Sequence, residues 1–260
     1  MDGTAAASDE FEDRLARALG GIPNMTPAQG RKVSRFIRDN RLRSCLELGF
    51  AHGVGTAWIA SAALGIGGQT TAIDLDAART RAPRIEETLA RVGLPPGAVE
   101  IHFEPTCYTW RLMKFLREGR ASSFDFVYLD GAHSWFTDGF AFFLCERLLR
   151  PGGWLLFDDL DWTFGTSSIA GEERVLRMPQ EERSTAQMRL VWDLLTKTGS
   201  GFDVLLEDGN WGFARRAAGR TPSVVVYRNR PLMRAALGAA RRVKRRLTRS
   251  SAALSDAARP

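Results

Sequence analysis

The stretch CLELGFAHGVGT, residues 45–56, followed by TTAIDLD, residues 70–76, decides the fold of this chain. An apolar strand runs into a glycine-rich turn, a helix follows, and a second strand ends in an acid. Glycines let the backbone approach a ligand, and the N-terminus of the helix offers free N–H groups to a carboxylate or phosphate. Asp74 stands where a side chain can accept hydrogen bonds from both ribose hydroxyls. This order predicts a pocket for a cofactor that carries a nucleoside.

The spacing of the acid and the glycines narrows the choice of nucleoside. A dinucleotide fingerprint reads G-x-G-x-x-G, whereas this chain has Glu47, Gly49, Gly53 and Gly55 in the order E-x-G-x-x-x-G-x-G. This pattern resembles the first motif of the class I S-adenosylmethionine-dependent methyltransferases. The resemblance implies that S-adenosylmethionine is the cofactor. The alternative is a structural strand–turn–helix corner in another α/β protein.

The resemblance also assigns the cofactor contacts. It implies that the glycine turn lines the methionine end, that Asp74 holds the ribose and that Leu75 lies beside the adenine. After the third strand the family usually has a Gly-Asp pair, whereas this chain has Glu104-Pro105-Thr106, so the match there is looser. The implied cofactor-binding residues are Glu47, Gly49, Phe50, Gly53, Gly55, Asp74, Leu75, Thr106 and Asp130.

Strand and helix patterns alternate along most of the chain. Five apolar strands, SCLELGF, TTAIDL, VEIHFE, FDFVYLD and WLLFDD, are separated by helical stretches, which indicates a parallel sheet covered on both faces. FDVLLED-GN-WGFARR then predicts an antiparallel hairpin. We therefore expect a Rossmann-like α/β fold, a doubly wound sheet of seven strands with five parallel strands and a C-terminal antiparallel hairpin. The order of the strands is implied by the resemblance.

Three segments are expected along the chain. Residues 1–42 form N-terminal helices, the second of which begins with a capping box of Thr26 and Gln29. Residues 43–216 form the methyltransferase domain, and residues 217–260 form a basic C-terminal extension. We expect the N-terminal helices to cover the cofactor mouth or an edge of the sheet.

An insertion occupies residues 160–200, between the fifth strand and the hairpin. Its loop carries Trp162 and Phe164 and leaves the C-terminal edge of the strands, where substrates enter open α/β sheets. We expect this loop to form a substrate wall or lid. The helical stretch at residues 184–197 is expected to pack against the sheet.

A second group of polar residues follows the fourth strand in LDGAHSW and the fifth strand in FDDLDW. Both segments leave the sheet at the edge that carries the glycine turn, so their side chains converge beside the transferable methyl group. Several ionisable side chains at one rim destabilise a protein unless their charge is used or paired. The ionisable residues expected there are Asp130, His133, Asp158 and Asp159.

These segments resemble the small-molecule and sugar O-methyltransferase branch, whose members carry Asp-Gly-x-His after the fourth strand. They are also similar to the catechol-type branch, in which an acid after the fourth strand and an Asp-Asn pair after the fifth bind magnesium. The resemblance implies Asp130, Asp158 and Asp159 as ligands of Mg²⁺, with Asp159 in place of the Asn. The catalytic lysine of that branch has no counterpart in LDGAHSW, which gives the role of base to His133.

The chemistry of methyl transfer explains why such groups are needed. A hydroxyl acceptor must lose its proton, which a histidine with a pKa near neutrality can take. A divalent cation bound to the oxygen lowers the pKa of that hydroxyl. We therefore expect methyl transfer to a hydroxyl of a small molecule or carbohydrate, with His133 and Asp130 as catalytic residues. The alternatives are a structural role for Asp130 as a turn cap and an exposed His133 at the start of a helix.

The charge of the chain is distributed unevenly. Residues 215–260 hold 13 of the 36 basic and one of the 30 acidic residues, a net of +12, which leaves 23 basic and 29 acidic residues and a net of −6 for the rest. A basic amphipathic helix in this extension can lie on an anionic membrane surface. Nucleic acid is a less favoured partner, because no aromatic residue follows Tyr227.

Other features place the chain in a cellular context. No apolar run reaches the ~18 residues of a membrane span, and the N-terminus lacks the apolar region of a secretory signal. Cys45, Cys107 and Cys145 form no CxxC pair and are expected to be free thiols. We expect a cytoplasmic enzyme and leave peripheral membrane attachment and oligomer formation open. The alternatives are a metal-independent methyltransferase of the same fold and a non-catalytic, cofactor-binding scaffold docked by its basic extension to membrane or nucleic acid.

Overall fold

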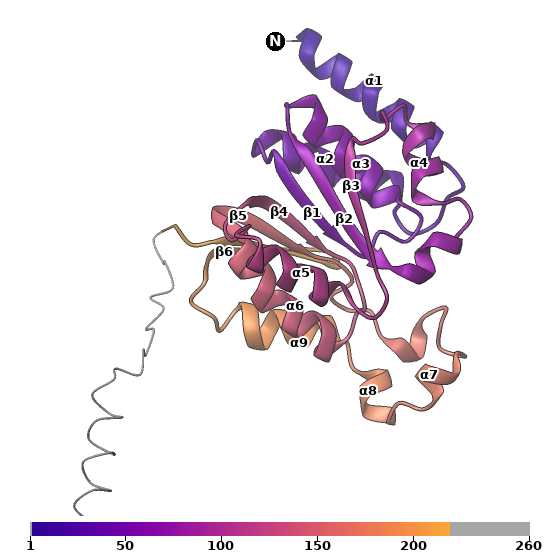
Figure 1. Ribbon diagram of the computed structural model, residues 1–260, viewed down its shortest axis with the longest axis vertical. Coiled ribbons are helices and arrows are strands. Elements are labelled where there is room, and N and C mark those ends of the chain that lie inside the picture. The colour runs from indigo at the N-terminus through magenta and orange to yellow at the C-terminus, as the bar shows by residue number, and fades with distance from the viewer. Residues whose placement is uncertain (1, 219–260) are drawn as a thin grey trace, which may run out of the picture. The chain divides into compact units, whose positions relative to one another are not determined.

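The structure, a computed structural model, describes the backbone of residues 2–218 and the side chains of residues 10–218. These residues form one seven-stranded sheet in the order β3-β2-β1-β4-β5-β7-β6 (Figure 1). The strands are β1 (Ser44–Leu48), β2 (Gln69–Leu75), β3 (Val99–Glu104), β4 (Phe124–Leu129), β5 (Leu149–Phe157), β6 (Phe202–Asp208) and β7 (Trp211–Arg216).

The direction of the strands confirms the predicted sheet. Neighbours among β1 to β5 are parallel, whereas β7 is antiparallel to both β5 and β6. The order reverses at β1 and β4, which lie side by side at the centre of the sheet. The loops after these two strands therefore diverge at a topological switch point, where ligands bind in open α/β sheets.

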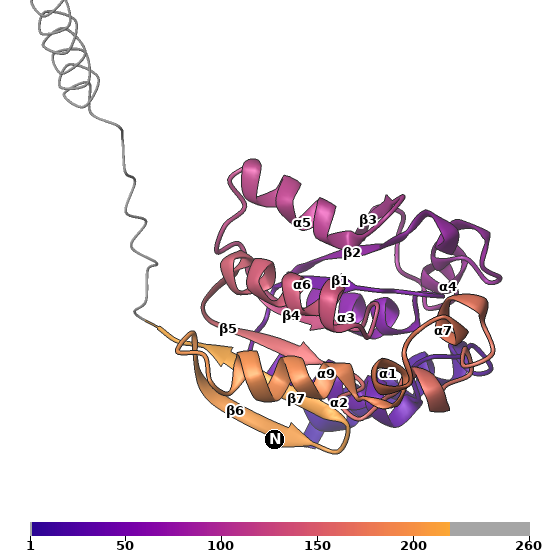
Figure 2. The ribbon, with the colours of Figure 1, turned by 90° about the horizontal axis from the view of Figure 1, so that it is seen from below.

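Helices cover both faces of the sheet. On one face, α2 (Pro27–Asp39) packs against α3 (Val54–Gly65). On the other, α5 (Tyr108–Arg117), α6 (Trp135–Leu148) and α9 (Gln187–Leu190) lie side by side in that order (Figure 2). The remaining α-helices within the described part are α1 (Asp2–Ala18), α4 (Ile85–Arg91), α7 (Glu173–Leu176) and α8 (Gln180–Ser184).

The sheet separates two hydrophobic clusters. The first joins α2 and α3 to the sheet and includes Val33, Ile37, Trp58 and Phe126. The second lies under α5, α6 and the segment after α9 and includes Leu112, Phe142, Phe157 and Trp192. All six residues of β4 are buried, as expected for a central strand that contacts both layers.

The structure confirms the capping box that was predicted at the start of the second N-terminal helix, α2. Gln29 N donates to Thr26 Oγ1 at 3.3 Å and Thr26 N donates to Gln29 Oε1 at 2.9 Å, which is the predicted capping box. The first helix, α1, spans Asp2–Ala18. Its fully buried Glu12 accepts hydrogen bonds from Arg35 and Arg38, which joins α1 to α2.

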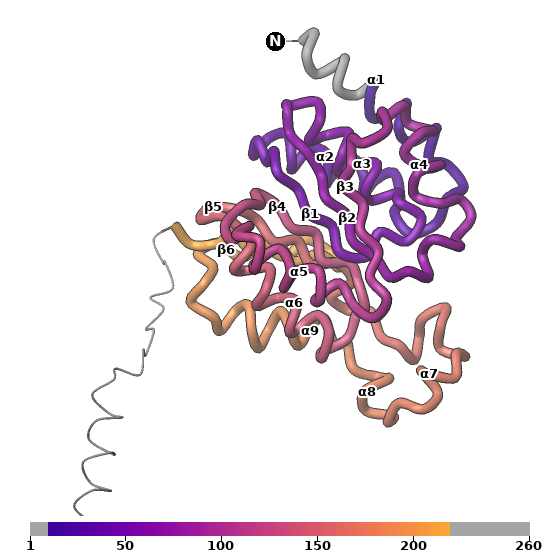
Figure 3. The backbone as a smooth tube through the Cα atoms, in the orientation of Figure 1, coloured from indigo at the N-terminus to yellow at the C-terminus, as the bar shows by residue number. Residues whose placement is uncertain are grey.

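The insertion after β5 leaves the sheet as a loop with short helices (Figure 3). The helix expected at residues 184–197 is present as α9 followed by a π-helix, Val191–Thr196. Met188, Val191 and Trp192 are buried against the sheet, as the spacing predicts.

The predictions for residues 217–260, including contact with an anionic membrane, concern a segment that, after residue 218, lies outside the described residues. They stay predictions. Within the described part, no helix has the length and apolar character needed to span a bilayer.

Candidate active site

The turn after β1 has a backbone that favours glycine at two positions. Gly49 has φ +86°, and a Cβ added there would overlap the carbonyl oxygen of Asp130. Gly53, which precedes α3, has φ +83°, and a Cβ there would stand 2.7 Å from Cγ1 of Ile85. Any other residue would combine an unfavourable φ with a steric overlap. The close contact at Gly49 brings the glycine turn and the loop after β4 together.

Asp74, at the end of β2, is hydrogen-bonded to this turn and also lines the adjoining cavity. Its Oδ2 accepts a hydrogen bond from Ala51 N at 2.7 Å, and its Oδ1 accepts one from Leu75 N at 2.6 Å. Each carboxylate oxygen retains a further lone pair. Asp74 can therefore still accept hydrogen bonds from ribose hydroxyls.

The other predicted cofactor residues of this motif lie beneath the turn. Glu47 is buried, accepts a hydrogen bond from the hydroxyl of Thr56, and has its pKa raised to about 8 by burial. A Cβ at Gly55 would overlap a carboxylate oxygen of Glu47. Phe50 is buried against Phe103, with ring centroids 5.4 Å apart. In this structure these residues support the turn from below and do not line the adjoining cavity.

A cavity of about 250 Å³ opens between the glycine turn and the loop after β4. The predicted residues that line it are Gly49, Asp74, Leu75, Thr106, Asp130 and His133. The lining also includes residues that were not among the predicted site residues: Asn24, Ala51, Arg81, Cys107, Tyr108, Gly131, Ala132 and Thr137. A larger groove, of about 740 Å³, lies between α2 and the β6–β7 hairpin and shares none of these residues. The smaller cavity is therefore the candidate cofactor site.

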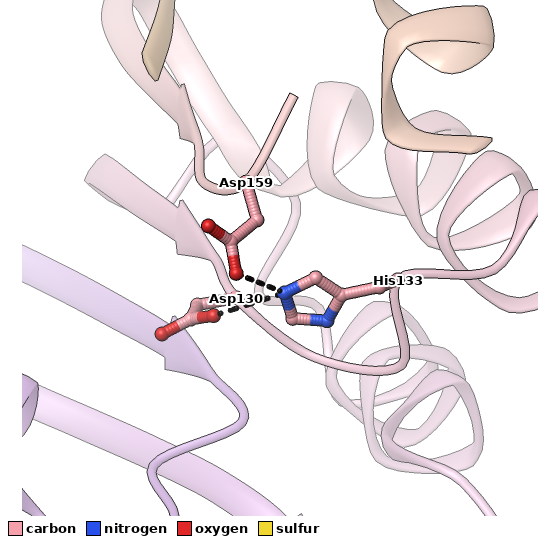
Figure 4. A group of neighbouring side chains, drawn as sticks. All are labelled: Asp130, His133 and Asp159. Carbon is pink, nitrogen blue, oxygen red and sulfur yellow. Dashed lines mark hydrogen bonds and ion pairs between the residues drawn. The ribbon is translucent and has the colours of Figure 1, made fainter. Parts of the chain in front are cut away.

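At one end of this cavity, His133 lies between two carboxylates (Figure 4). Its Nε2 is 3.0 Å from Oδ2 of Asp159 and 3.6 Å from Oδ1 of Asp130. Its Nδ1 is 3.0 Å from the carbonyl oxygen of Gly131, which can only accept a hydrogen bond, so Nδ1 carries a proton. Nε2 then faces carboxylate oxygens that also only accept. The arrangement therefore favours a proton between Nε2 and these oxygens, on the ring or on a carboxyl group, or a cation between these atoms.

The electrostatics of this group favour positive charge. Burial alone would lower the pKa of His133, but the hydrogen bond to Asp159 and the charge of that residue outweigh it, so the pKa is raised. Loss of hydration, together with the charges of Asp158 and Asp159, raises the pKa of Asp130 well above its usual range. A proton or a cation bound here relieves the repulsion between the carboxylates.

The structure corrects the predicted metal ligand set at Asp158. This residue is buried, and its Oδ1 accepts hydrogen bonds from Trp211 Nε1 at 2.6 Å and from Asp159 N at 2.7 Å. Its Oδ2 accepts one from the hydroxyl of Tyr128. The backbone turns at Asp159, which has φ +53°, and of the two adjacent aspartates only Asp159 is within hydrogen-bond distance of His133. Donor atoms of Asp130, His133 and Asp159 lie within 4.8 Å of one another, a set that suits a divalent cation.

A buried hydrogen-bond network that the sequence did not indicate holds the loop after β4. The hydroxyl of Tyr108 donates to Asp138 and accepts a hydrogen bond from Ala132 N at 3.2 Å. Asp138 is fully buried and also accepts from Ser134 N at 2.9 Å. The network joins α5, α6 and the loop that carries His133. It depends on residues 30 positions apart, which no local motif connects.

The loop of the insertion contacts the site through Trp162. The ring of Trp162 lies 4.8 Å from that of His133 and 4.7 Å from that of Phe164. Phe164 is buried and anchors the loop. Trp162 therefore contacts a residue of the candidate site, whereas the role of the loop as a substrate wall or lid stays a prediction.

Comparisons with known proteins agree with this architecture. Residues 46–160 match a family model described as a methyltransferase domain. No curated protein sequence matches the chain at a significant level. The O-methyltransferase TomG from Streptomyces achromogenes, solved in complex with S-adenosylmethionine, is 20% identical with a TM-score of 0.57, over 81% of this chain and 91% of that chain.

Two further solved structures have the same fold. An O-methyltransferase from Bacillus cereus, in complex with S-adenosylhomocysteine, is 17% identical with a TM-score of 0.55, over 82% of this chain and 91% of that chain. The S-adenosylhomocysteine-bound methyltransferase PaMTH1 from Podospora anserina is 14% identical with a TM-score of 0.55, over 84% and 94%. With the family match, these likenesses lead to one conclusion: residues 46–160 of this chain match a methyltransferase domain, and the described part of the chain has the fold of these solved methyltransferases.

Proposed function

We propose that the chain transfers a methyl group from S-adenosylmethionine to a hydroxyl of a small molecule or sugar. The observation that carries this proposal is the position of the Asp130–His133–Asp159 group, at the end of the cavity that Gly49 and Asp74 also line. Proton-accepting groups there would lie beside the transferable methyl. The solved neighbours described as O-methyltransferases support oxygen as the acceptor.

The cofactor supplies an electrophilic methyl group, so the main tasks of the protein are to place the acceptor and to remove its proton. To act as a base, His133 would first release the second proton that Asp159 favours, and its remaining proton would stay on Nδ1, held by the Gly131 carbonyl at 3.0 Å. Nε2 would take the proton of the hydroxyl as the oxygen attacks the methyl group. Asp159, 3.0 Å from Nε2, would stabilise the imidazolium that results, and Asp130 would add to this stabilisation.

A divalent cation such as Mg²⁺ offers a second route, because a cation bound to the acceptor oxygen lowers the pKa of the hydroxyl. Asp130, Asp159 and His133 would hold it, since their donor atoms already lie within 4.8 Å of one another. In this route His133 is a ligand and not the base. Titration with Mn²⁺, followed by electron paramagnetic resonance, separates the possible ligands. D159N should weaken Mn²⁺ binding, whereas D158N should retain it, because Asp158 points into the core.

The activity itself is tested by the release of S-adenosylhomocysteine with a panel of hydroxylated metabolites and glycans, each paired with its amino analogue. We expect turnover with a hydroxylated acceptor and none with the matched amine. Loss of turnover with EDTA and its recovery with Mg²⁺ would select the cation route, whereas insensitivity to EDTA would select His133 as the sole base. Methylation of the amines alone, or of no acceptor in the panel, would contradict the proposal.

A further inference from the structure

A second cavity, of about 460 Å³, lies within the insertion, and nothing in the proposed chemistry uses it. It lies between the loop after β5 and α8. The side chains that line it are polar. They belong to Asp161, Thr163, Thr166, Gln180, Arg183 and Ser184.

This cavity adjoins the proposed methyl-transfer site. Asp161 lines it and follows Asp159 by two residues, a separation of at most about 7 Å along an extended chain. Trp162, the next residue, contacts the ring of His133. One ligand could therefore place a hydroxyl at His133 while another part of it occupies the second cavity.

The charges around the cavity leave one cation without an anionic partner. Asp161 pairs with Arg189, whose Nε and Nη2 lie 3.0 and 2.7 Å from its Oδ1 and whose Nη1 also pairs with Glu207. Arg183 donates from Nη2 to Gln180 Oε1 at 2.8 Å, and no ion pair joins it to an acid among the described residues. Its Nε is buried and has no hydrogen-bond partner there. A guanidinium that lines a cavity without an anionic partner favours a ligand that supplies one.

We propose that this cavity is the acceptor subsite for an anionic oxygen group, a carboxylate or a phosphate, that binds to Arg183. A guanidinium matches the planar array of oxygens in such groups, and charge-assisted hydrogen bonds are the stronger ones. The hydroxyls of Thr163, Thr166 and Ser184 would add hydrogen bonds to the same ligand. The substrate class is then a hydroxylated acid or a hydroxylated phosphate ester. The role as an acceptor subsite rests on the proposed methyl transfer, whereas the binding of an anion does not.

The test is calorimetric titration of the full chain saturated with S-adenosylhomocysteine, so that anions cannot enter the cofactor cavity. The probes are inorganic phosphate, glucose 6-phosphate and, as the uncharged match, glucose. We expect both phosphates to bind and glucose to bind more weakly. R183Q should weaken phosphate binding roughly tenfold or more, and R183K should retain part of it. The matched control is R177Q, just after α7, because Arg177 is exposed and already paired with Glu173.

Unchanged affinity of each variant for S-adenosylhomocysteine shows that it has folded. No binding of either phosphate to the wild type, or equal binding to the wild type and R183Q, would overturn the proposal. Binding is measured without turnover, so its failure is distinct from a failure of methyl transfer. Once an acidic acceptor is known, R183Q should raise its KM and leave kcat nearly unchanged.

Discussion

The two sides of the active site are built by different means. On the cofactor side, the backbone of β1 and β2 and a glycine turn fix the shape, and the carboxylate of Asp74 is held by two backbone N–H groups. On the acceptor side, side chains of the loops after β4 and β5 meet through charge, as at His133 and Asp159. The geometry of the cofactor side is therefore determined by backbone conformation. The geometry of the acceptor side is determined by the protonation and ion pairing of its side chains.

The largest loss of activity should come from a substitution on the acceptor side. H133Q removes the imidazole but keeps a polar side chain of similar size, so kcat should fall by about 10²–10⁴-fold. The affinity for S-adenosylhomocysteine should stay unchanged, because the turn at Gly49 is untouched. H102Q is the control: His102 pairs with Glu100 on β3 and does not line the cavity. If H133Q lowered the affinity for S-adenosylhomocysteine as much as kcat, the acceptor side and the cofactor side would not act independently.

The cofactor side is tested by G49A. The added methyl group would overlap the carbonyl oxygen of Asp130, and φ +86° is unfavourable for alanine. We expect the affinity for S-adenosylhomocysteine, measured by calorimetry, to fall by about a hundredfold, which corresponds to about 3 kcal/mol. G93A is the matched control, since Gly93 has φ +77° but open space around a Cβ. Equal loss of binding in both variants would show that backbone strain, and not the contact with Asp130, is the cause.

The difference between the cofactor side and the acceptor side also explains which parts of the site could be predicted from the sequence. Gly49, Gly53 and Asp74 lie within one strand–turn–helix–strand unit, so their roles follow from local spacing. The seven-stranded sheet follows from the alternation of apolar strands and helices together with the family resemblance. Each of these features is determined by short-range rules for backbone conformation.

The acceptor side was less predictable because long-range contacts decide it. Asp158 and Asp159 are adjacent acids, and only the donors on Tyr128 and Trp211 show which of them turns into the core. The pairing of Tyr108 with Asp138, and the position of Arg183 in a second cavity, likewise depend on segments brought together by the fold.

Y108F should have an intermediate effect. The variant leaves buried Asp138 without the donor from Tyr108 and Ala132 N without its acceptor, which should destabilise the fold by about 1–3 kcal/mol. Urea denaturation measures this change. Because Ala132 lies next to His133, kcat should also fall. Y128F, which removes the other tyrosine–aspartate bond, is the comparison: it should lower kcat less, and a reversed order would show that the Tyr108 network does not position His133.

The smallest effect on stability should come from loss of the ion pairs between the insertion and the β6–β7 hairpin. Hydrogen bonds from Lys197, Arg189 and Trp192 lower the pKa of Glu207 to about 2, from a usual value of 4.5. Since the folded-state pKa is the lower one, ionised Glu207 stabilises the fold above pH ~4.5, and this contribution is lost as the pH falls toward 2. The side chain is 37% exposed, so solvent screening should keep the contribution below about 1 kcal/mol.

We therefore expect E207Q to be slightly less stable than the wild type at pH 7, with a difference that shrinks as denaturation is repeated toward pH 3. Hydrogen exchange should increase in residues 187–197 and not around the glycine turn, because Arg189 and Lys197 each lose an anionic partner. E87Q is the matched control on the cofactor side, where Glu87 pairs with Arg84 in an exposed position. Faster exchange at the glycine turn in E207Q would mean that the hairpin supports both sides of the site. The cofactor side would then depend on charge as well as on backbone conformation, contrary to the comparison made above.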